Sequence, residues 1–554
     1  HTLTSYDNLG RAIASAQYTS TGSITVGSTD PGATGTQSNR VALNKTAYDS
    51  LGRVYLSTRY KVTQANGTDA DSLTTNTWRD AAGRTVKVCG EQVTKTAYDR
   101  LGRVTNQFVL AQDDDASYSD VSTVTGDIVF TQDETVYEST DSDNVVMRVH
   151  LDRFHDTAAN IALDANWDGG AHNVMKISSG DLYGRAQITA LWYDDLDRVI
   201  DTVNYGNYSS ADFDRKPSGS WLTQPTRSQT ALRTTTTYND DGTVLETESP
   251  GKPSTPAGTT GVKTRYTYDA LGRQTKVVNN YDGSVNSGNP SGTADNQTIT
   301  YTFASGLRTS ITAVMPSGGT DQTTTYIYGT TSGTPSDMKI TTKNLLRAVK
   351  YPDSTNAGTN QAYIDGTSDA DVVSYAYNAQ GQRTSVKDQA GTTLISTYDT
   401  GGRETIQTAS ALGSGIDGAV RRKETTYQSR GPVDKVTQYN ATSSGSVTDE
   451  LQYTYDDWGN IASLTQDPDS AIGGGGRASF AVSYTYSKAT SGCGGGGRQT
   501  VRRDTASYPG GSDLTYDYTS GSYGSAGGID EAASRILGVY NGATLVSRYF
   551  YLGT

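Results

Sequence analysis

The chain has 554 residues and a formal net charge of −13, and 34% of its residues are hydrophobic. The negative charge argues against nucleic acid and anionic membranes as partners, because both need clustered Lys and Arg, and no stretch approaches the ~20 consecutive apolar residues of a membrane span. Tyr occurs 37 times against 7 Phe and 5 Trp, and Gly occurs 60 times. This composition indicates a β protein with half-buried surfaces and many reverse turns.

Taken in chain order, the predicted elements are organised around a six-residue motif, Y-D-x-L-G-R. Strict copies lie at Tyr6–Arg11, Tyr48–Arg53, Tyr98–Arg103 and Tyr268–Arg273. Relaxed copies lie at Tyr193–Arg198, Tyr398–Arg403 and Tyr455–Asn460, and weaker ones begin at Asp80, Tyr238 and Tyr377. The residues assigned to the repeated structural motif are Tyr6, Asp7, Gly10, Arg11, Tyr48, Asp49, Gly52, Arg53, Tyr98, Asp99, Gly102, Arg103, Tyr268, Asp269, Gly272, Arg273, Tyr398, Asp399, Gly402, Arg403, Tyr455, Asp456 and Gly459.

Each motif is predicted to be the tip of a β-hairpin. Alternating residues flank it, as in Val54–Tyr60, and this period-two pattern indicates strands. Between the strands D-x-x-G is a turn, because the Asp side chain can accept a nearby backbone N–H and Gly can adopt a positive φ. The substitutions agree with a turn: Asp197 replaces Gly, and Asn239 and Asn378 replace Asp while offering the same local bond. A turn closed by a left-handed Gly predicts an adjacent bulge.

The remaining motif residues predict how hairpins associate. Tyr and Arg of one motif are expected to face each other across the strand pair, ring against guanidinium. The Leu at the tip is expected to be covered by the next repeat, since one hairpin alone is marginally stable. Many hairpins would then join into a continuous sheet, as neighbouring units do in other repeat proteins.

The recurrence of Y-D-x-L-G-R from Tyr6 to at least Tyr455, in a chain rich in Tyr, Gly and Thr, resembles the YD repeat of the RHS family. That family includes shell-forming components of bacterial toxin complexes, polymorphic RHS toxins and animal teneurins. The resemblance implies an all-β fold in which YD hairpins join into a continuous, spiralling, largely antiparallel sheet that forms a hollow shell or part of one. It also implies that residues 1–554 are a single YD-repeat region, which we expect to be a fragment of a longer chain.

Two segments depart from the repeat. Residues 111–192 lack a clean motif and are expected to form a long hairpin or an inserted element. Within them Asp164–Gly169 matches the opening of a calcium loop, but Met175 stands where the Glu ligand belongs, so an Asx-rich turn is favoured. Residues 470–500 hold two runs of four glycines without a phosphate-binding signature and are expected to be loop insertions. No metal site and no cofactor are predicted.

Residue types that carry catalysis are scarce. The chain has 4 His and no G-x-S-x-G, H-E-x-x-H or metal-spaced Cys/His pattern. The resemblance implies that aspartates of a D-P-x-G-type segment catalyse self-cleavage in toxin-carrying relatives, but Asp467–Ser470 only faintly matches that signature. No catalytic residue is therefore predicted. Cys89 and Cys493 are expected to be two free thiols, with a long-range disulfide as the alternative.

These expectations lead to a non-catalytic structural scaffold, extracellular or at a cell surface, built of YD repeats. One alternative is the encapsulating shell of a toxin-delivery RHS protein. Another is a cell-surface adhesion or carbohydrate-binding module, since Tyr and Trp suit sugar faces. The expected partners are other segments of the same parent chain, further copies of the chain, an enclosed toxin polypeptide or surface glycans. Neither nucleic-acid binding nor membrane insertion is expected.

Overall fold

The computed structural model describes residues 1–20, 24, 29–113, 115, 120–124, 127–139, 142–153, 184–208, 223–250, 261–282, 296–315, 319–334, 336–352, 371–474, 479–491, 498–519, 531, 534–549 and 551. Within these residues the named elements are 33 strands and one short 3-10 helix, η1 (Asp120–Ser122). The described part of the chain holds no helix with the length and hydropathy needed to cross a bilayer.

The strands of the first half are β1 (Thr2–Tyr6), β2 (Ala12–Tyr18), β3 (Arg40–Tyr48), β4 (Val54–Val62), β5 (Asp69–Arg79), β6 (Thr85–Cys89), β7 (Val93–Tyr98), β8 (Val104–Gln112), β9 (Ile128–Ser139), β10 (Ser142–Arg153), β11 (Gly184–Tyr193), β12 (Val199–Tyr208), β13 (Leu232–Tyr238), β14 (Val244–Ser249), β15 (Val262–Tyr268) and β16 (Gln274–Asn279). The strands of the second half are β17 (Gln297–Ala304), β18 (Leu307–Ala313), β19 (Gln322–Thr330), β20 (Thr342–Lys350), β21 (Val372–Tyr377), β22 (Arg383–Lys387), β23 (Thr393–Tyr398), β24 (Glu404–Ala411), β25 (Arg422–Tyr427), β26 (Val433–Tyr439), β27 (Val447–Tyr455), β28 (Ile461–Asp467), β29 (Phe480–Ser491), β30 (Arg498–Tyr508), β31 (Ser512–Asp517), β32 (Gly538–Asn541) and β33 (Thr544–Arg548).

These strands form one antiparallel meander. Each pairs with the strand before it in the chain, from β1–β2 through β9–β10 and β19–β20 to β32–β33, and β1 does not pair with β33 among the described strands. At the motif hairpins the register shifts beside the Tyr, as between Ala47 and Tyr48 and between Ala97 and Tyr98. This shift is the bulge that a turn with a left-handed Gly introduces. The predicted all-β, continuous and antiparallel sheet is confirmed.

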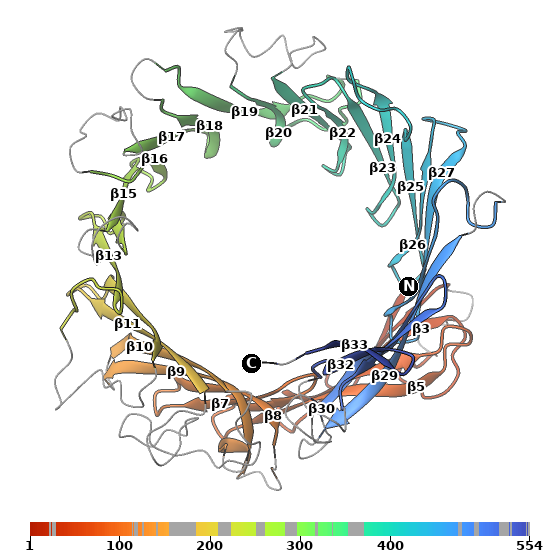
Figure 1. Cartoon of the computed structure of the whole chain (residues 1–554), viewed down its shortest axis with the longest axis horizontal. Coiled ribbons are helices and arrows are strands. Elements are labelled where there is room, and N and C mark those ends of the chain that lie inside the picture. Colours follow the sequence, from red (N-terminus) through yellow and green to blue (C-terminus); the bar gives the residue numbers. More distant parts are fainter. Residues whose placement is uncertain are drawn as a thin grey trace.

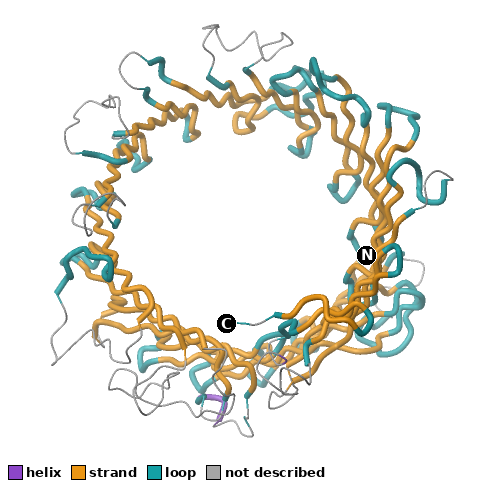
Figure 2. Tube along the Cα trace, in the orientation of Figure 1, coloured by secondary structure: helices purple, strands orange, loops and turns teal. Residues whose placement is uncertain are grey.

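The strip of sheet curves into a ring around an open centre (Figure 1). Near its end, β29 and β30 lie alongside β5 of the first strands, so the two ends overlap after about one turn (Figure 1). In Figure 2 strands make up almost all of the wall, while the connections gather at its margins. The predicted spiral course around a hollow is thus the path that the described chain takes.

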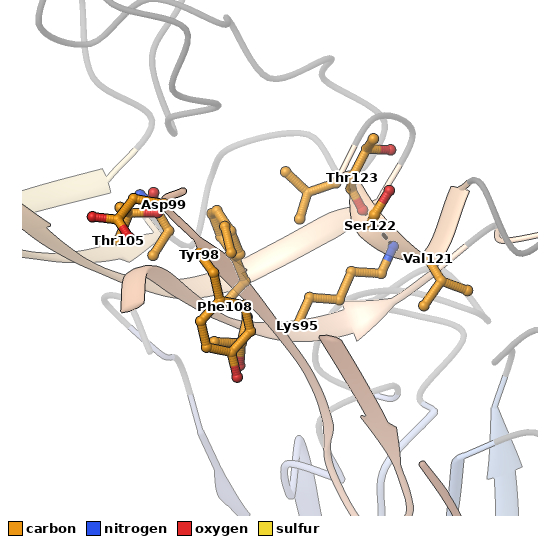
Figure 3. A pocket seen from close by; sticks show the side chains of 12 residues that line it. Lys95, Tyr98, Asp99, Thr105, Phe108, Val121, Ser122 and Thr123 are labelled. Atoms are coloured by element: carbon orange, nitrogen blue, oxygen red, sulfur yellow. Dashed lines mark hydrogen bonds between the residues drawn. The ribbon is translucent and has the colours of Figure 1, made fainter. Parts of the chain in front are cut away.

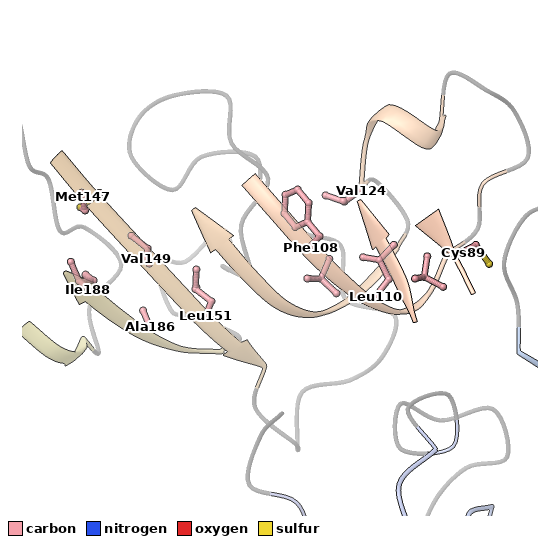
Figure 4. Packing of buried hydrophobic residues seen from close by; sticks show 11 residues of the cluster. Cys89, Phe108, Leu110, Val124, Met147, Val149, Leu151, Ala186 and Ile188 are labelled. Atoms are coloured by element: carbon pink, nitrogen blue, oxygen red, sulfur yellow. The ribbon is translucent and has the colours of Figure 1, made fainter. Parts of the chain in front are cut away.

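Buried apolar side chains form separate patches along the strip. The largest patch spans β6 to β11 and includes Val124, which follows η1 (Figure 4). It contains Cys89, Val93, Phe108, Leu110, Val124, Val129, Met147, Val149, Leu151, Ala186 and Ile188. A smaller patch joins β2, β3 and β4 through Ala16, Tyr18, Leu43 and Val62. Because burial on a sheet follows alternate residues, each patch covers one face of a few strands.

The two segments that depart from the repeat are only partly described. Within residues 111–192 the strands β9 and β10 pair as a hairpin of two 12-residue strands, followed by β11. The candidate calcium loop at Asp164–Gly169, with Met175, lies outside the described residues. Within residues 470–500, β29 and β30 form a hairpin, and the second glycine run and part of the first lie outside the described residues.

Candidate functional site: the hairpin tips and the seam

The hairpin tips are the repeated site that the sequence points to, and the strict copies share one turn geometry. The Asp49 N–H donates to the Arg53 carbonyl at 2.8 Å, and the Gly52 N–H donates to the Asp49 carbonyl at 3.0 Å. Gly52 has a φ of 79°, in the left-handed region where a side chain is costly. The same two bonds and a left-handed glycine recur at the tips that contain Gly10, Gly102, Gly272, Gly402 and Gly459.

The motif Asp holds the turn with both of its carboxylate oxygens. Asp49 Oδ1 accepts the N–H groups of Leu51 and Arg53, each at 2.9 Å, and Oδ2 accepts the Arg53 Nε–H at 2.8 Å. The backbone hydrogen bond from Arg53 is the main reason that the pKa of Asp49 lies below its ordinary value, and it acts against desolvation. The pKa of Asp7 is lowered in the same way. This carboxylate is therefore committed to the turn.

Two substituted tips keep the arrangement. Asp197, in the glycine position, has a φ of 58°, and its N–H donates to the Asp194 carbonyl at 3.0 Å. Asn378, in the Asp position, accepts the N–H groups of Gln380 and Gln382 at 3.0 and 2.9 Å. A short polar side chain thus replaces the motif residue at either place, as turn chemistry predicts.

The prediction for the tip at Asn239 is wrong in one respect. The backbone turn is kept, since the Asn239 N–H donates to the Thr243 carbonyl and the Gly242 N–H donates to the Asn239 carbonyl. However, the Thr243 N–H donates to Asp241 Oδ1 at 2.9 Å, and the Asn239 Nδ2 donates to the Thr243 hydroxyl. A second Asp inside this turn competes with the Asn oxygen, because a carboxylate is the stronger acceptor.

The prediction that Tyr and Arg of one motif face each other is also wrong, because the contact joins successive hairpins. The Arg11 guanidinium carbon lies 4.7 Å from the centroid of the Tyr48 ring, and that of Arg403 lies 4.3 Å from the Tyr427 ring. The same stacking joins Arg84 to Tyr98, Arg103 to Tyr137 and Arg198 to Tyr238. The edge of the guanidinium pairs with the Asp of its own turn, so its flat face remains available to the neighbouring ring.

The Tyr hydroxyl makes a second link to the preceding hairpin. Tyr48 Oη donates to the Ala12 carbonyl and Tyr238 Oη to the Val199 carbonyl, each at 2.8 Å. Ala12 and Val199 directly follow the Arg residues that stack on these two rings. One Tyr is therefore held through its ring and its hydroxyl by the same arm of the hairpin before it. The motif is both a turn and a connector between turns.

The tip leucines are not covered by the next repeat, contrary to expectation. The exposed fractions of Leu9, Leu51, Leu101, Leu196 and Leu271 are 77, 74, 62, 70 and 77%. The next hairpin lies beside the tip within the sheet, so it does not extend over the rim from which these side chains project.

A seam forms where the two ends of the strip overlap. The Asp457 carbonyl accepts the Val62 N–H at 3.4 Å, and Asp457 Oδ1 accepts the Gln64 N–H at 3.1 Å. Farther along, the Lys488 Nζ donates to Asp71 Oδ1 at 2.9 Å. These bonds join residues 393 and 417 positions apart in the chain. The seam therefore brings the tip between β27 and β28 to the end of β4, and strand β29 to β5.

At the seam, the Leu position of the motif is buried. It is occupied by Trp458, which has an exposed fraction of 9%.

At the other end of the seam, the Gln499 N–H donates to the Gly90 carbonyl at 3.2 Å. The adjacent Cys89 is disulfide-bonded. The expectation of a free thiol is therefore wrong for Cys89, while Cys493 lies outside the described residues.

A buried ion-pair network beside η1 was missed by the sequence analysis. Lys87 Nζ lies 2.8 Å from Asp113 Oδ2 and 2.7 Å from Asp115 Oδ2, and Lys95 Nζ lies 2.8 Å from Asp115 Oδ1 and 2.6 Å from Asp127 Oδ2. Burial raises the pKa of Asp127 to about 6, against the opposing charge and hydrogen bond of Lys95. Nothing in the sequence pattern around Lys87 and Lys95 indicates that they are buried, because their Asp partners come from the connection between β8 and β9.

A cavity of about 420 Å³ adjoins this network and is lined by residues of β7, β8 and η1 (Figure 3). The Lys95 ammonium lies at its edge and is engaged by Asp115, Asp127 and the Thr123 carbonyl. Asn106 is 3% exposed, and its Nδ2 has no hydrogen-bond partner. The cavity thus offers one buried amide donor, while its charged groups are held in ion pairs.

His150 is held between two carboxylates on the same sheet. Its Nδ1 lies 2.6 Å from Asp133 Oδ1 and its Nε2 lies 3.1 Å from Asp152 Oδ1. Burial lowers the pKa of His150, but the hydrogen bond and charge of Asp133, together with Asp152, outweigh it and raise the pKa. Among the described residues, no group of three or more His, Cys, Asp or Glu side chains is arranged to hold a metal ion.

Comparison with known proteins gives similarity to solved structures only. No family model matches the chain, and no curated protein sequence matches it. A structure titled TcdB2-TccC3-TEV has a TM-score of 0.32 at 12% identity over 94% of this chain, and TcdB2-TccC3 without its hypervariable C-terminal region has 0.28 at 13% over 86%. The Tc holotoxin pore of Photorhabdus luminescens has 0.24 at 13% over 93%. The chain spans 26, 26 and 28% of the length of these solved chains.

Proposed function

We propose that this chain is a non-catalytic structural scaffold of the RHS type, a curved wall built of YD hairpins that works outside the cell. The observation that carries the proposal is the continuous sheet of 33 described strands that curves around an open centre until its ends overlap (Figure 1). A wall of this kind needs a repeated unit that closes its own turn and attaches to the next unit. The YD motif supplies both functions.

The chemistry of the motif supports a structural role. The carboxylate of Asp49 is taken up by two backbone N–H groups and by Arg53, and the flat face of the Arg11 guanidinium is taken up by Tyr48. Catalytic acids and bases are usually poised near neutral pH, whereas the pKa of Asp49 is moved away from neutrality. Repeated motif residues that satisfy one another stabilise a sheet and leave no reactive group exposed.

The disulfide supports the extracellular location. Cys89 is disulfide-bonded, and disulfides persist in oxidising compartments such as the extracellular space, the periplasm and the cell surface. The net charge of −13 also favours a soluble wall that stays apart from anionic membranes.

A second candidate is an enclosing wall around another polypeptide, as the RHS resemblance implies. The observation that favours it is the open centre of the ring (Figure 2), which a purely filamentous or adhesive module does not require. In this version the inner face of the sheet surrounds the passenger, and the seam closes the enclosure.

Electron microscopy of the recombinant chain and of the particle isolated from its source tests both candidates. We expect the recombinant chain to give a ring with a hollow centre. Additional density inside the ring of the native particle would support the enclosing wall. An empty centre would contradict the enclosing wall and support the scaffold without a passenger. Separate compact domains or a flat, uncurved sheet would contradict both.

A further inference from the structure

The two margins of the strip differ in kind. Connections from each odd-numbered strand to the next even-numbered strand lie on one margin, because the sheet is a meander. This margin, here called the tip rim, carries the turns of the Y-D-x-L-G-R motif and the exposed Leu9, Leu51, Leu101, Leu196 and Leu271. The opposite margin, here called the loop rim, carries the connections from even to odd strands. The five leucines are each more than half exposed, so the tip rim carries an apolar side chain at each of these separate tips.

At the seam a tip meets another turn of the sheet, and the residue at the Leu position of that tip is buried. There a tip of the second turn contacts the loop rim of the first turn, because Asp457 accepts N–H groups from Val62 and Gln64 at the end of β4. The next residue, Trp458, is 9% exposed, although it stands at the motif position where the five leucines are 62 to 77% exposed. The Leu position is therefore buried at the tip whose neighbouring residue bonds to a loop rim, and it is exposed at the five tips with Leu.

The chemistry of this contact does not depend on the particular tip. One of the two seam bonds at Asp457 uses its main-chain carbonyl, and every tip has a carbonyl at the same place. The second component is the apolar side chain that follows. The tips with Leu9, Leu51 and Leu101 have both components, and no loop rim covers them among the described residues.

We infer that the tip rim is a docking surface for the loop rim of a second copy of this chain, so that rings stack head to tail. The complementary surface is present on the same molecule. At the loop rim of the last strands, residues 412–421 and 509–511 connect β24 to β25 and β30 to β31, and the apolar side chains of Ile416, Val420 and Tyr508 are exposed there. The stacking contact repeats the seam between molecules. It rests on the proposed role of the chain as a wall and extends that wall along its axis.

Because the tip rim and the loop rim are different surfaces, the contact is heterologous. A heterologous contact that does not close generates open stacks rather than a closed pair. The stack is therefore expected to grow with concentration, with a free tip rim at one end and a free loop rim at the other.

The test compares the wild-type chain with Leu51→Glu/Leu101→Glu by light scattering coupled to size exclusion, over a wide concentration range. We expect the wild-type mass to rise above that of a single chain in multiples, and the double variant to remain a single chain. Gln17→Glu/Gln107→Glu is the matched control, because it adds the same charge at two exposed positions within strands and should assemble like the wild type. A wild-type chain that stays monomeric, or a rim variant that assembles equally, would overturn the inference.

A mixing experiment separates head-to-tail stacking from contact between two tip rims. The rim variant retains its loop rim, so it should cap growing stacks and shorten them when added to the wild type. If it leaves the wild-type assemblies unchanged, the head-to-tail arrangement is wrong. Microscopy of the same samples distinguishes the two proposals. A monomeric ring would refute the docking of rings but would still agree with the proposed curved wall. A chain that does not curve into a ring would refute both proposals.

Discussion

Gly102 illustrates why single residues of the motif are hard to replace. Its φ is 87°, and a Cβ built there would approach Arg84 Nη1 at 3.4 Å. We expect Gly102→Val to lower the local free energy of unfolding of the β7–β8 hairpin by about 1 kcal/mol or more, because a β-branched residue resists a positive φ. Hydrogen exchange of peptides from β7 and β8 measures this loss. Gly102→Asn is the control and should lose less, as Asn tolerates this region; equal exchange in all three proteins would contradict the turn.

Asp127 is expected to make the free energy of unfolding depend on pH. Its pKa in the folded chain is raised to about 6, above the ordinary value, so the folded state binds more protons than the unfolded state between pH ~4 and ~6. The contribution of this group to stability is therefore present at low pH and is lost as the pH rises through about 6. We expect Asp127→Asn to remove a pH-dependent loss of about 1–3 kcal/mol across that window.

The measurement for Asp127 is the difference in unfolding free energy between variant and wild type at a series of pH values. Taking the difference cancels the turn aspartates, such as Asp7 and Asp49, whose pKa values are lowered and which therefore act with the opposite sign as the pH falls. Lys95, Asp113 and Asp115 face Asp127, so they are left unchanged in both proteins. A flat difference from pH 4 to pH 7 would show that burial does not govern Asp127.

At the scale of the hairpin, sequence reasoning succeeded where the chemistry is local. The turn at Asp49 to Gly52 depends on residues within four positions of each other, so the pattern of the sequence specifies it. The partner of Arg11 is Tyr48, on the next hairpin, and a motif read by itself does not identify a partner that the sheet brings from elsewhere. The Lys87 and Lys95 network was missed for the same reason, since its aspartates follow β8 and precede β9.

The link between hairpins can be measured as a coupling energy. We expect the double-mutant cycle of Arg11→Met and Tyr48→Leu to give about 0.5–1 kcal/mol of favourable coupling, because the guanidinium stacks on the aromatic ring at 4.7 Å and Leu removes that ring. Tyr48→Phe alone should also lose the hydroxyl bond to Ala12, at a cost of about 0.5–1.5 kcal/mol. The control cycle pairs Arg11→Met with Tyr6→Leu, since Tyr6 is in the same motif but is 60% exposed. Greater coupling in the control cycle would show that Arg11 interacts with Tyr6 of its own motif and not with Tyr48 of the next hairpin.

At the scale of the whole molecule, curvature is a property that no single repeat encodes. Each hairpin contacts the hairpins on either side of it, and small rotations between them add up until β29 and β30 reach β5 (Figure 1). The bonds of the seam, such as Lys488 to Asp71, connect residues that the sequence places at opposite ends. The overlap therefore has to be stabilised by contacts outside the repeat, and a covalent bond at Cys89 lies beside one of them.

That bond leads to a prediction about the whole ring. The chain has 2 Cys, so we expect peptide mapping without reduction to recover Cys89 joined to Cys493; a bond from Cys89 to a second molecule would contradict this.

Reduction of the disulfide, or Cys89→Ser, should then lower the unfolding free energy by about 2–5 kcal/mol, because a disulfide restricts the unfolded chain most when it closes a long loop. Hydrogen exchange should quicken at Val62 and Gln64, whose N–H groups bond across the seam. Strands β13 to β16, across the ring (Figure 1), are the internal control, and equal acceleration there would mean that the bond stabilises the sheet generally and not the seam.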